Sequence, residues 1–202
     1  MNRSNSVSAL LLACALLMLA GGTPSAQTPP TNPDAPAQRR ESEKERLDRL
    51  FERLKNAPTP EAANPITRQI EQRFERSGSE TADLLLQRAK QAIEAKNFES
   101  ALDLLDYIVT LRPDWAEAYH RRAIVHFLNK DEDSAMRDIR MTLAQEPRHF
   151  QALAGLGRLL QMMGKRKPAF EVYQQVLAIH PHFPEIKGMI DRLKPAAEGQ
   201  PI

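Results

Sequence analysis

Small residues and prolines recur along this chain at a fixed interval. They form three evenly spaced columns: Pro113, Pro147 and Pro181; Ala101, Ala135 and Ala169; and Ala89, Ala123 and Gly157. A period of about 34 residues is typical of a solenoid of helix–turn–helix repeats, in which each repeat packs only on its neighbours. The sequence therefore predicts an all-α fold whose core forms by stacking pairs of antiparallel helices.

The columns divide the central chain into three repeats, at 82–115, 116–149 and 150–183. A small residue in the first helix of each repeat and an alanine in the second allow the two helices to approach closely. The proline ends each second helix, because it cannot continue the backbone hydrogen-bond ladder. In the first repeat we expect helices near 82–95 and 98–111.

Apolar residues spaced as on one face of a helix occur on both sides of the repeats. We expect an amino-terminal helix pair within 41–81, with one helix from 41 to about 56 and a second from about 65 to 76, and with Pro58 and Pro60 between them. This pair is expected to cover the exposed apolar edge of the first repeat.

A helix over 184–194 is expected to cap the other end of the repeats. Asp191 stands at its small-residue position, where another helix could not pack closely, as a solubilising cap requires. Residues 195–202 are expected to form a frayed tail.

The amino-terminal residues 1–26 have the layout of a secretory signal peptide. Arg3 precedes an uncharged apolar stretch over 7–20, which is shorter than the roughly 20 residues that span a bilayer. Two alternatives stay open: an inner-membrane anchor retained over 7–20, and a lipoprotein modified at Cys14. The proline-rich residues 27–40 are expected to form an extended linker. We therefore expect a periplasmic or secreted protein.

Composition argues against several classes of function. The net charge of +2 offers no basic patch for nucleic acid, and the sequence contains no glycine-rich phosphate loop. The only cysteine is Cys14, so thiol catalysis and cysteine-ligated metal are not expected in the mature chain. We expect no cofactor, and membrane contact only through a retained signal segment.

No catalytic constellation is apparent among the polar residues. The five histidines form no HExxH motif, and His126 is expected to be half-buried in the repeat core. Trp115 and the pair Met162–Met163 are expected to pack rather than to form a binding site. A hydrolase or metal enzyme therefore lacks candidate residues, and we expect no enzymatic activity.

With these columns the chain resembles the tetratricopeptide repeat (TPR) family. The resemblance covers about half of the chain, and it is carried by Ala89, Phe98, Ala101, Pro113, Tyr119, Ala123, Ala135, Pro147, Leu153, Leu156, Gly157, Leu160, Ala169, Tyr173 and Pro181. The chain departs from the family pattern at Arg88 and Arg122, where leucine is usual, and at Lys96 and Lys130, where the first helix often ends in glycine. The expected fold is an α-solenoid of three TPR repeats with an amino-terminal helix pair and a carboxy-terminal capping helix.

The resemblance implies a concave groove lined by the first helix of each repeat. The implied groove residues combine basic side chains with an apolar floor: Lys90, Ile93, His120, Arg121, Ile124, Phe127, Arg158 and Met162. Such a lining suits an extended or helical peptide with acidic and apolar side chains. The carboxylate clamp of TPR proteins that hold chaperone tails is not reproduced, since Leu86 and Lys90 replace its first two residues.

The sequence thus predicts a protein or peptide partner. The leading hypothesis is a non-enzymatic adaptor or scaffold of the bacterial envelope that binds its partner in the groove. The alternative is a structural subunit of a larger envelope complex, which would use the convex face or the caps, self-associate, and hold no ligand in the groove.

Overall fold

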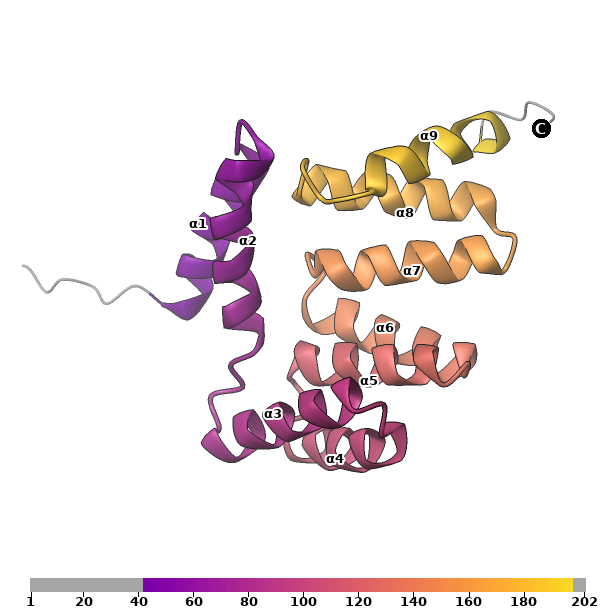
Figure 1. Cartoon of the computed structure of the whole chain (residues 1–202). Helices are drawn as coiled ribbons and strands as arrows, with labels where there is room; N and C mark the ends of the chain where they lie inside the picture. The colour runs from indigo at the N-terminus through magenta and orange to yellow at the C-terminus, as the bar shows by residue number, and fades with distance from the viewer. Residues whose placement is uncertain (1–41, 198–202) are drawn as a thin grey trace, which may run out of the picture. The chain divides into compact units, whose positions relative to one another are not determined.

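The computed structural model describes residues 42–197, with side chains over 42–194. In this range the chain forms nine α-helices (Figure 1): α1 Glu43–Lys55, α2 Pro60–Phe74, α3 Glu80–Glu94, α4 Phe98–Leu111, α5 Ala116–Leu128, α6 Glu132–Gln145, α7 Phe150–Met162, α8 Arg166–Ile179 and α9 Ile186–Ala197. The all-α prediction is confirmed. None of the helices in the described part of the chain is long and apolar enough to cross a membrane. The predicted signal peptide (1–26), the linker (27–40) and the end of the predicted tail lie outside the described residues.

The three repeats are the helix pairs α3–α4, α5–α6 and α7–α8, stacked in chain order (Figure 1). Ala89, Ala123 and Gly157 are all buried where the first helix meets the second. A Cβ at Gly157 would overlap the ring of Tyr173. Leu105 and Ile139 stand where the third repeat has Tyr173, so the one glycine of this column faces its largest partner.

The three turns within the repeats share one backbone conformation. Lys96, Lys130 and Gly164 stand at equivalent positions of the three repeats and have φ angles of 56°, 63° and 72°. In each turn the next backbone N–H donates to the carbonyl five residues earlier, which closes a Schellman motif at the end of the first helix. Lys96 and Lys130 thus adopt the left-handed conformation of the usual glycine, at a cost of roughly 1 kcal/mol each.

The amino-terminal helix pair begins its second helix earlier than predicted. The structure starts α2 at Pro60 rather than near 65, because Thr59 caps the helix with its hydroxyl and Pro60 occupies the first helical position, where its missing N–H costs nothing. Pro65 lies inside α2, and burial of Ala63 and Ile66 on either side outweighs the one hydrogen bond that it removes. At the other end of the chain, α9 begins at Ile186, after Glu185 with φ 64°, and continues to Ala197.

The expectation that this pair covers the first repeat is wrong. The buried residues of α1 and α2 share one core with α7, α8 and α9, whereas α3 and α4 belong to a separate core. The reason is that α2 packs across the loops that join successive repeats (Figure 1). Trp115, His149 and Phe183 occupy the same column of these loops, and the first two contact Phe74 of α2 directly.

The contacts between α2 and the loops combine polar and aromatic groups. Trp115 donates its indole N–H to the carbonyl of Phe74 over 2.7 Å, and the rings of Phe74 and His149 stack at 4.5 Å. At the middle of α2, His180 and Thr67 are hydrogen-bonded at 2.9 Å. Through these contacts, α2 connects loops that belong to successive repeats.

Candidate binding groove

A pocket of about 460 Å³ opens between α5 and α7, on the inner helices of the second and third repeats. One side chain of α6 and one of the loop after α8 complete it. Its lining is His120, Arg121, Ala123, Ile124, Phe127, Leu128, Ile139, Gln151, Ala152, Ala154, Gly155, Arg158, Leu159 and Phe183. Volumes of this size are typical of sites that hold a small ligand or a few side chains.

Five of the eight residues predicted for the groove line this pocket: His120, Arg121, Ile124, Phe127 and Arg158. The other three do not. Ile93 packs partly buried in the core of the first repeat. Met162 is 57 % exposed near the end of α7, and the Lys90 ammonium is bound by a carboxylate of the α2–α3 link.

The end of α2 supplies carboxylates to the groove. Glu75 accepts from Lys90 Nζ at 2.6 Å and from Arg121 at 3.0 Å, and Glu71 accepts from Gln151 at 2.9 Å. Burial, together with the nearby carboxylate of Glu117, raises the pKa of Glu71. Two of the predicted groove cations are thus already paired within the chain, over sequence separations that no local pattern reveals.

A buried polar cluster lies beneath this end of the groove, where α5 meets the loop before α7. Glu117 Oε2 is 3.1 Å from His149 Nε2 and 3.4 Å from His120 Nδ1, and Glu117 Oε1 accepts from Arg121 at 2.5 Å. Burial alone would raise the pKa of Glu117, but its contacts with these two histidines and the arginine hold that pKa well below its usual range. Burial lowers the pKa of His149, assisted by the charge of His120.

The same three side chains, Glu117, His120 and His149, are close enough to hold a metal ion, since their ligand atoms lie within 4.8 Å of one another. The chemistry of His149 argues against it. Its Nδ1 accepts from the backbone N–H of Ala152 at 3.2 Å, so its proton stands on Nε2, the atom that would have to bind the metal. The cluster is better explained as a hydrogen-bonded junction between α5 and α7. Its residues were not singled out as a group from the sequence, because no recognisable spacing joins them.

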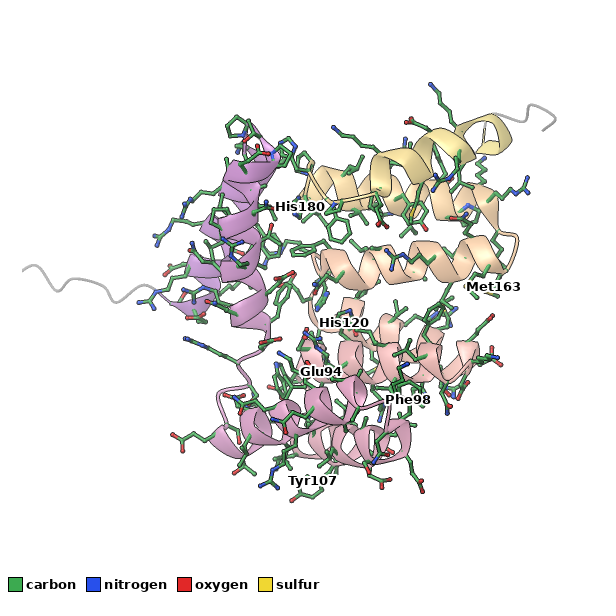
Figure 2. All side chains as sticks on the ribbon, in the orientation of Figure 1. Glu94, Phe98, Tyr107, His120, Met163 and His180 are labelled. Atoms are coloured by element: carbon green, nitrogen blue, oxygen red, sulfur yellow. The ribbon has the colours of Figure 1, made fainter. Side chains whose placement is uncertain are left out.

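The ends of α5 and α7 carry exposed apolar side chains, of which Phe127 and Leu128 line the pocket. Phe127, Leu128, Met162 and Met163 are between 38 % and 57 % exposed at the ends of α5 and α7. Figure 2 shows Met163 at the end of α7 away from the α1–α2 pair, and His120 near that pair. The expected packing of Met162–Met163 is therefore wrong, whereas that of Trp115 is confirmed, since it is only 6 % exposed.

Arg158 is the cation most available to a ligand in the pocket. Its side chain is 51 % exposed, and the carboxylate that it faces, Glu185, lies 3.7 Å away with 71 % exposure. Ion pairs this exposed contribute little and exchange readily. His126 is half-buried, as expected, between Asp131 at 3.6 Å and Asp138 at 3.7 Å.

No family model matches the chain. A TPR repeat-containing protein of Rhizobium etli is 40 % identical to it over 140 residues, which cover 69 % of each chain. The small glutamine-rich tetratricopeptide repeat-containing protein 2 of Saccharomyces cerevisiae is 29 % identical over 98 residues, which cover 48 % of this chain and 28 % of that protein.

Solved TPR structures share the fold. The first TPR domain of Spaghetti (RPAP3), bound to the HSP90 peptide SRMEEVD, superposes with a TM-score of 0.55 at 19 % identity and covers 58 % of this chain and 93 % of that one. MamA superposes with a TM-score of 0.54 at 19 % identity and covers 68 % of this chain and 84 % of its own.

Proposed function

Because the chain belongs to the TPR repeat-containing protein family, we propose that it binds a short segment of a partner protein in the pocket between α5 and α7, and that it catalyses no reaction. The TPR domain is a protein–protein interaction fold, and the Spaghetti domain that shares it was solved with an acidic peptide in complex. We infer for this chain only that the groove binds a peptide, and not that it binds the same peptide as the Spaghetti domain.

The observation that carries the proposal is the combination of lining groups in the pocket. Ile124, Phe127 and Leu159 offer apolar contacts, and Arg158 offers a charge at the rim. A peptide that places an apolar side chain between α5 and α7 and a carboxylate near Arg158 would satisfy both. Burial of one large apolar side chain contributes roughly 2 kcal/mol.

The helix α2 limits the length of that segment. The carboxylate of Glu75, the residue that follows α2, pairs with both Lys90 and Arg121, so the part of the groove next to the first repeat is already neutralised. The free portion lies over the second and third repeats. We therefore propose a ligand of a few residues rather than a peptide that follows the whole groove.

The proposed location is the bacterial envelope. Support comes from residues 1–26, whose charged start, apolar stretch and small residues have the layout of a signal peptide. Cell fractionation, with mass spectrometry of the mature amino terminus, tests this directly. A cleaved amino terminus in the periplasm is the expected result, and a full-length chain in the cytoplasm would contradict it.

Crosslinked pull-down from intact cells tests the groove. The double variant Arg158→Glu, Phe127→Ser is expected to lose partners that the wild type recovers, because it removes both the rim charge and an apolar contact. Arg140→Glu, on an exposed position of α6 outside the pocket, is the matched control and should retain them. Equal recovery by a folded double variant would exclude the pocket as the binding site.

A further inference from the structure

The outward face of α3 is exposed, although the equivalent faces of α5 and α7 are buried. Leu84 is 50 % exposed, whereas Ala118 and Ala152, its equivalents in the second and third repeats, are both 0 % exposed. Leu85 is half-buried, whereas its equivalents Tyr119 and Leu153 are 8 % and 4 % exposed. The first repeat thus presents an apolar face that the fold covers in the other two.

The covering element in the other repeats is the second helix of the repeat before. The helix α4 packs on α5, and α6 packs on α7. Among the described helices, α3 has an extensive contact only with α4, since α1 and α2 pack elsewhere. Figure 1 shows α3–α4 at one end of the stack and α9 at the other.

Charge specifies which kind of helix this face fits. Arg122 of the second repeat binds Asp106 of the preceding helix at 2.8 Å and Asp138 of its own repeat at 2.7 Å. Arg88 stands at the same position of the first repeat, is exposed, and has no ion pair among the described residues. Its own repeat has Leu104 where the second has Asp138, and no described helix packs on α3 in the way that α4 packs on α5 to supply an equivalent of Asp106.

We propose that the outward face of α3 docks a helix of another protein, with an apolar stripe against Leu84 and Leu85 and a carboxylate opposite Arg88. The packing of α4 on α5 is the template: the incoming helix takes the place of the second helix of a missing repeat. This surface is separate from the pocket between α5 and α7, and the inference does not depend on the function proposed for that pocket.

A second copy of the chain fits this face less well. Two copies joined through α3 would pack α3 on α3, whereas in the template α4, which carries Asp106, packs on α5. Among the described side chains, the opposite end of the stack offers no matching stripe, because the exposed ones of α9 include Lys187, Asp191 and Arg192. A partner helix that carries an acidic residue satisfies both the charge and the apolar surface.

The test uses a stapled helical peptide with the sequence of residues 97–113, because α4 already fits the equivalent face of α5. Stapling is needed, since an isolated helix of this length is marginal in water. Binding to the full chain is followed by chemical-shift changes of the Leu84 and Leu85 methyl groups. We expect Arg88→Glu to weaken binding about five-fold, the upper range for an exposed ion pair.

A charge exchange supplies the decisive comparison. The peptide with Asp106→Arg should bind the Arg88→Glu chain more tightly than it binds the wild-type chain. In contrast, the Arg140→Glu chain should bind the unmodified peptide as tightly as the wild-type chain does. Circular dichroism checks that each variant is folded, as exposure of Arg88 predicts.

Three results of the peptide experiment would overturn the inference. They are no binding at about 1 mM peptide, shift changes confined to the pocket between α5 and α7, and equal affinity for the wild type and Arg88→Glu. Dimerisation of the wild type that is abolished by Leu84→Asp would assign the face to a second copy and would also overturn it.

Discussion

The first and third repeats follow the same sequence columns but have different surroundings. The third repeat packs on α6, is covered by α9, and shares its core with α1 and α2. The first repeat has α5 on one side and an exposed outer face on the other, where Leu84 is 50 % exposed. The difference shows that the stabilisation of a repeat depends on its neighbours as well as on its own sequence.

The helix pair that precedes the first repeat in the chain stabilises the far end of the stack. The link between α2 and α3 makes this possible: Gly78 adopts φ 76°, and Arg112 donates to the carbonyl of Ser77. The chain thereby turns between the end of α2 and the start of α3. We expect amide hydrogen exchange to be faster in α3 and α4 than in α7 and α8.

The largest expected effect comes from removing the contact between α2 and the third repeat. Phe74→Ala should lower the free energy of unfolding by about 3–5 kcal/mol, because this buried ring packs on Phe51, His149 and Phe150. The emission of the single tryptophan, Trp115, should shift to the red as α2 separates from its indole. Chemical denaturation followed by circular dichroism measures the change.

Tyr107→Ala is the control for this variant, because Tyr107 is 59 % exposed on α4 of the first repeat. It should change the stability by less than about 0.5 kcal/mol. A loss for Phe74→Ala no larger than that of the control would mean that α1 and α2 do not stabilise the third repeat.

Acidification should also weaken the packing of α2 on the third repeat, with a smaller loss of stability than that expected for Phe74→Ala. Burial, with the charge of His182, lowers the pKa of His180 to about 4. The reason is geometric: Thr67 donates to the carbonyl of Ala63, so His180 Nε2 donates to Thr67, and the buried Nδ1 is left with no partner to accept its proton.

The direction in which stability changes with pH follows from this lowered pKa. The unfolded chain takes up a proton on His180 near pH 6.5 and the folded chain only near pH 4, so stability is complete above about pH 6.5 and falls as the pH drops toward 4. The loss from His180 alone is at most about 3 kcal/mol at pH 4. His149, whose pKa is also lowered by burial, acts in the same direction.

Urea denaturation between pH 7 and 4 measures this dependence. His180→Phe removes the titrating group and should flatten the part of the curve that His180 contributes. An unchanged slope in this variant would show that protonation of His180 is not responsible.

The smallest expected effect is a gain in stability at the first repeat, which is the less covered end of the stack. Lys96→Gly should stabilise the first repeat by about 1 kcal/mol, because glycine adopts the φ of 56° without strain. Lys130→Gly in the second repeat, with φ 63°, is the matched variant and should give a similar gain. Thermal unfolding measures both gains, with hydrogen exchange of α3 and α4 for Lys96→Gly and of α5 and α6 for Lys130→Gly, and a loss of stability would contradict the assignment of strain to these turns.

Much of the fold followed from periodicity. The column of Ala89, Ala123 and Gly157 located the close contact within each repeat, and the helix predicted over 98–111 has the bounds of α4. Such features depend on residues within one repeat length, so the sequence pattern contains them. The start of α2 was missed, because Pro60 was interpreted as part of the break after the first helix and Pro65 as the start of the second, whereas Pro60 itself occupies the first position of α2.

The candidate groove was predicted only in part. His120, Arg121, Ile124, Phe127 and Arg158 line the pocket because they follow the period of the inner helices. That Lys90 and Arg121 are paired with Glu75 was not foreseeable from the same period, because Glu75 belongs to the segment that departs from it.

By itself, the sequence determined a three-repeat helical stack, its turns and the small residues at its helix contacts, because each of these depends on interactions local to one repeat. Only the tertiary structure decided where the amino-terminal pair packs, which groove cations are paired, and which end of the stack stays open. Those outcomes depend on whether an apolar helix face buries more surface on the neighbouring repeat or on a distant one. In this protein Phe74 contacts Trp115 and His149, which are distant from it in the sequence, and only the tertiary structure brings them together.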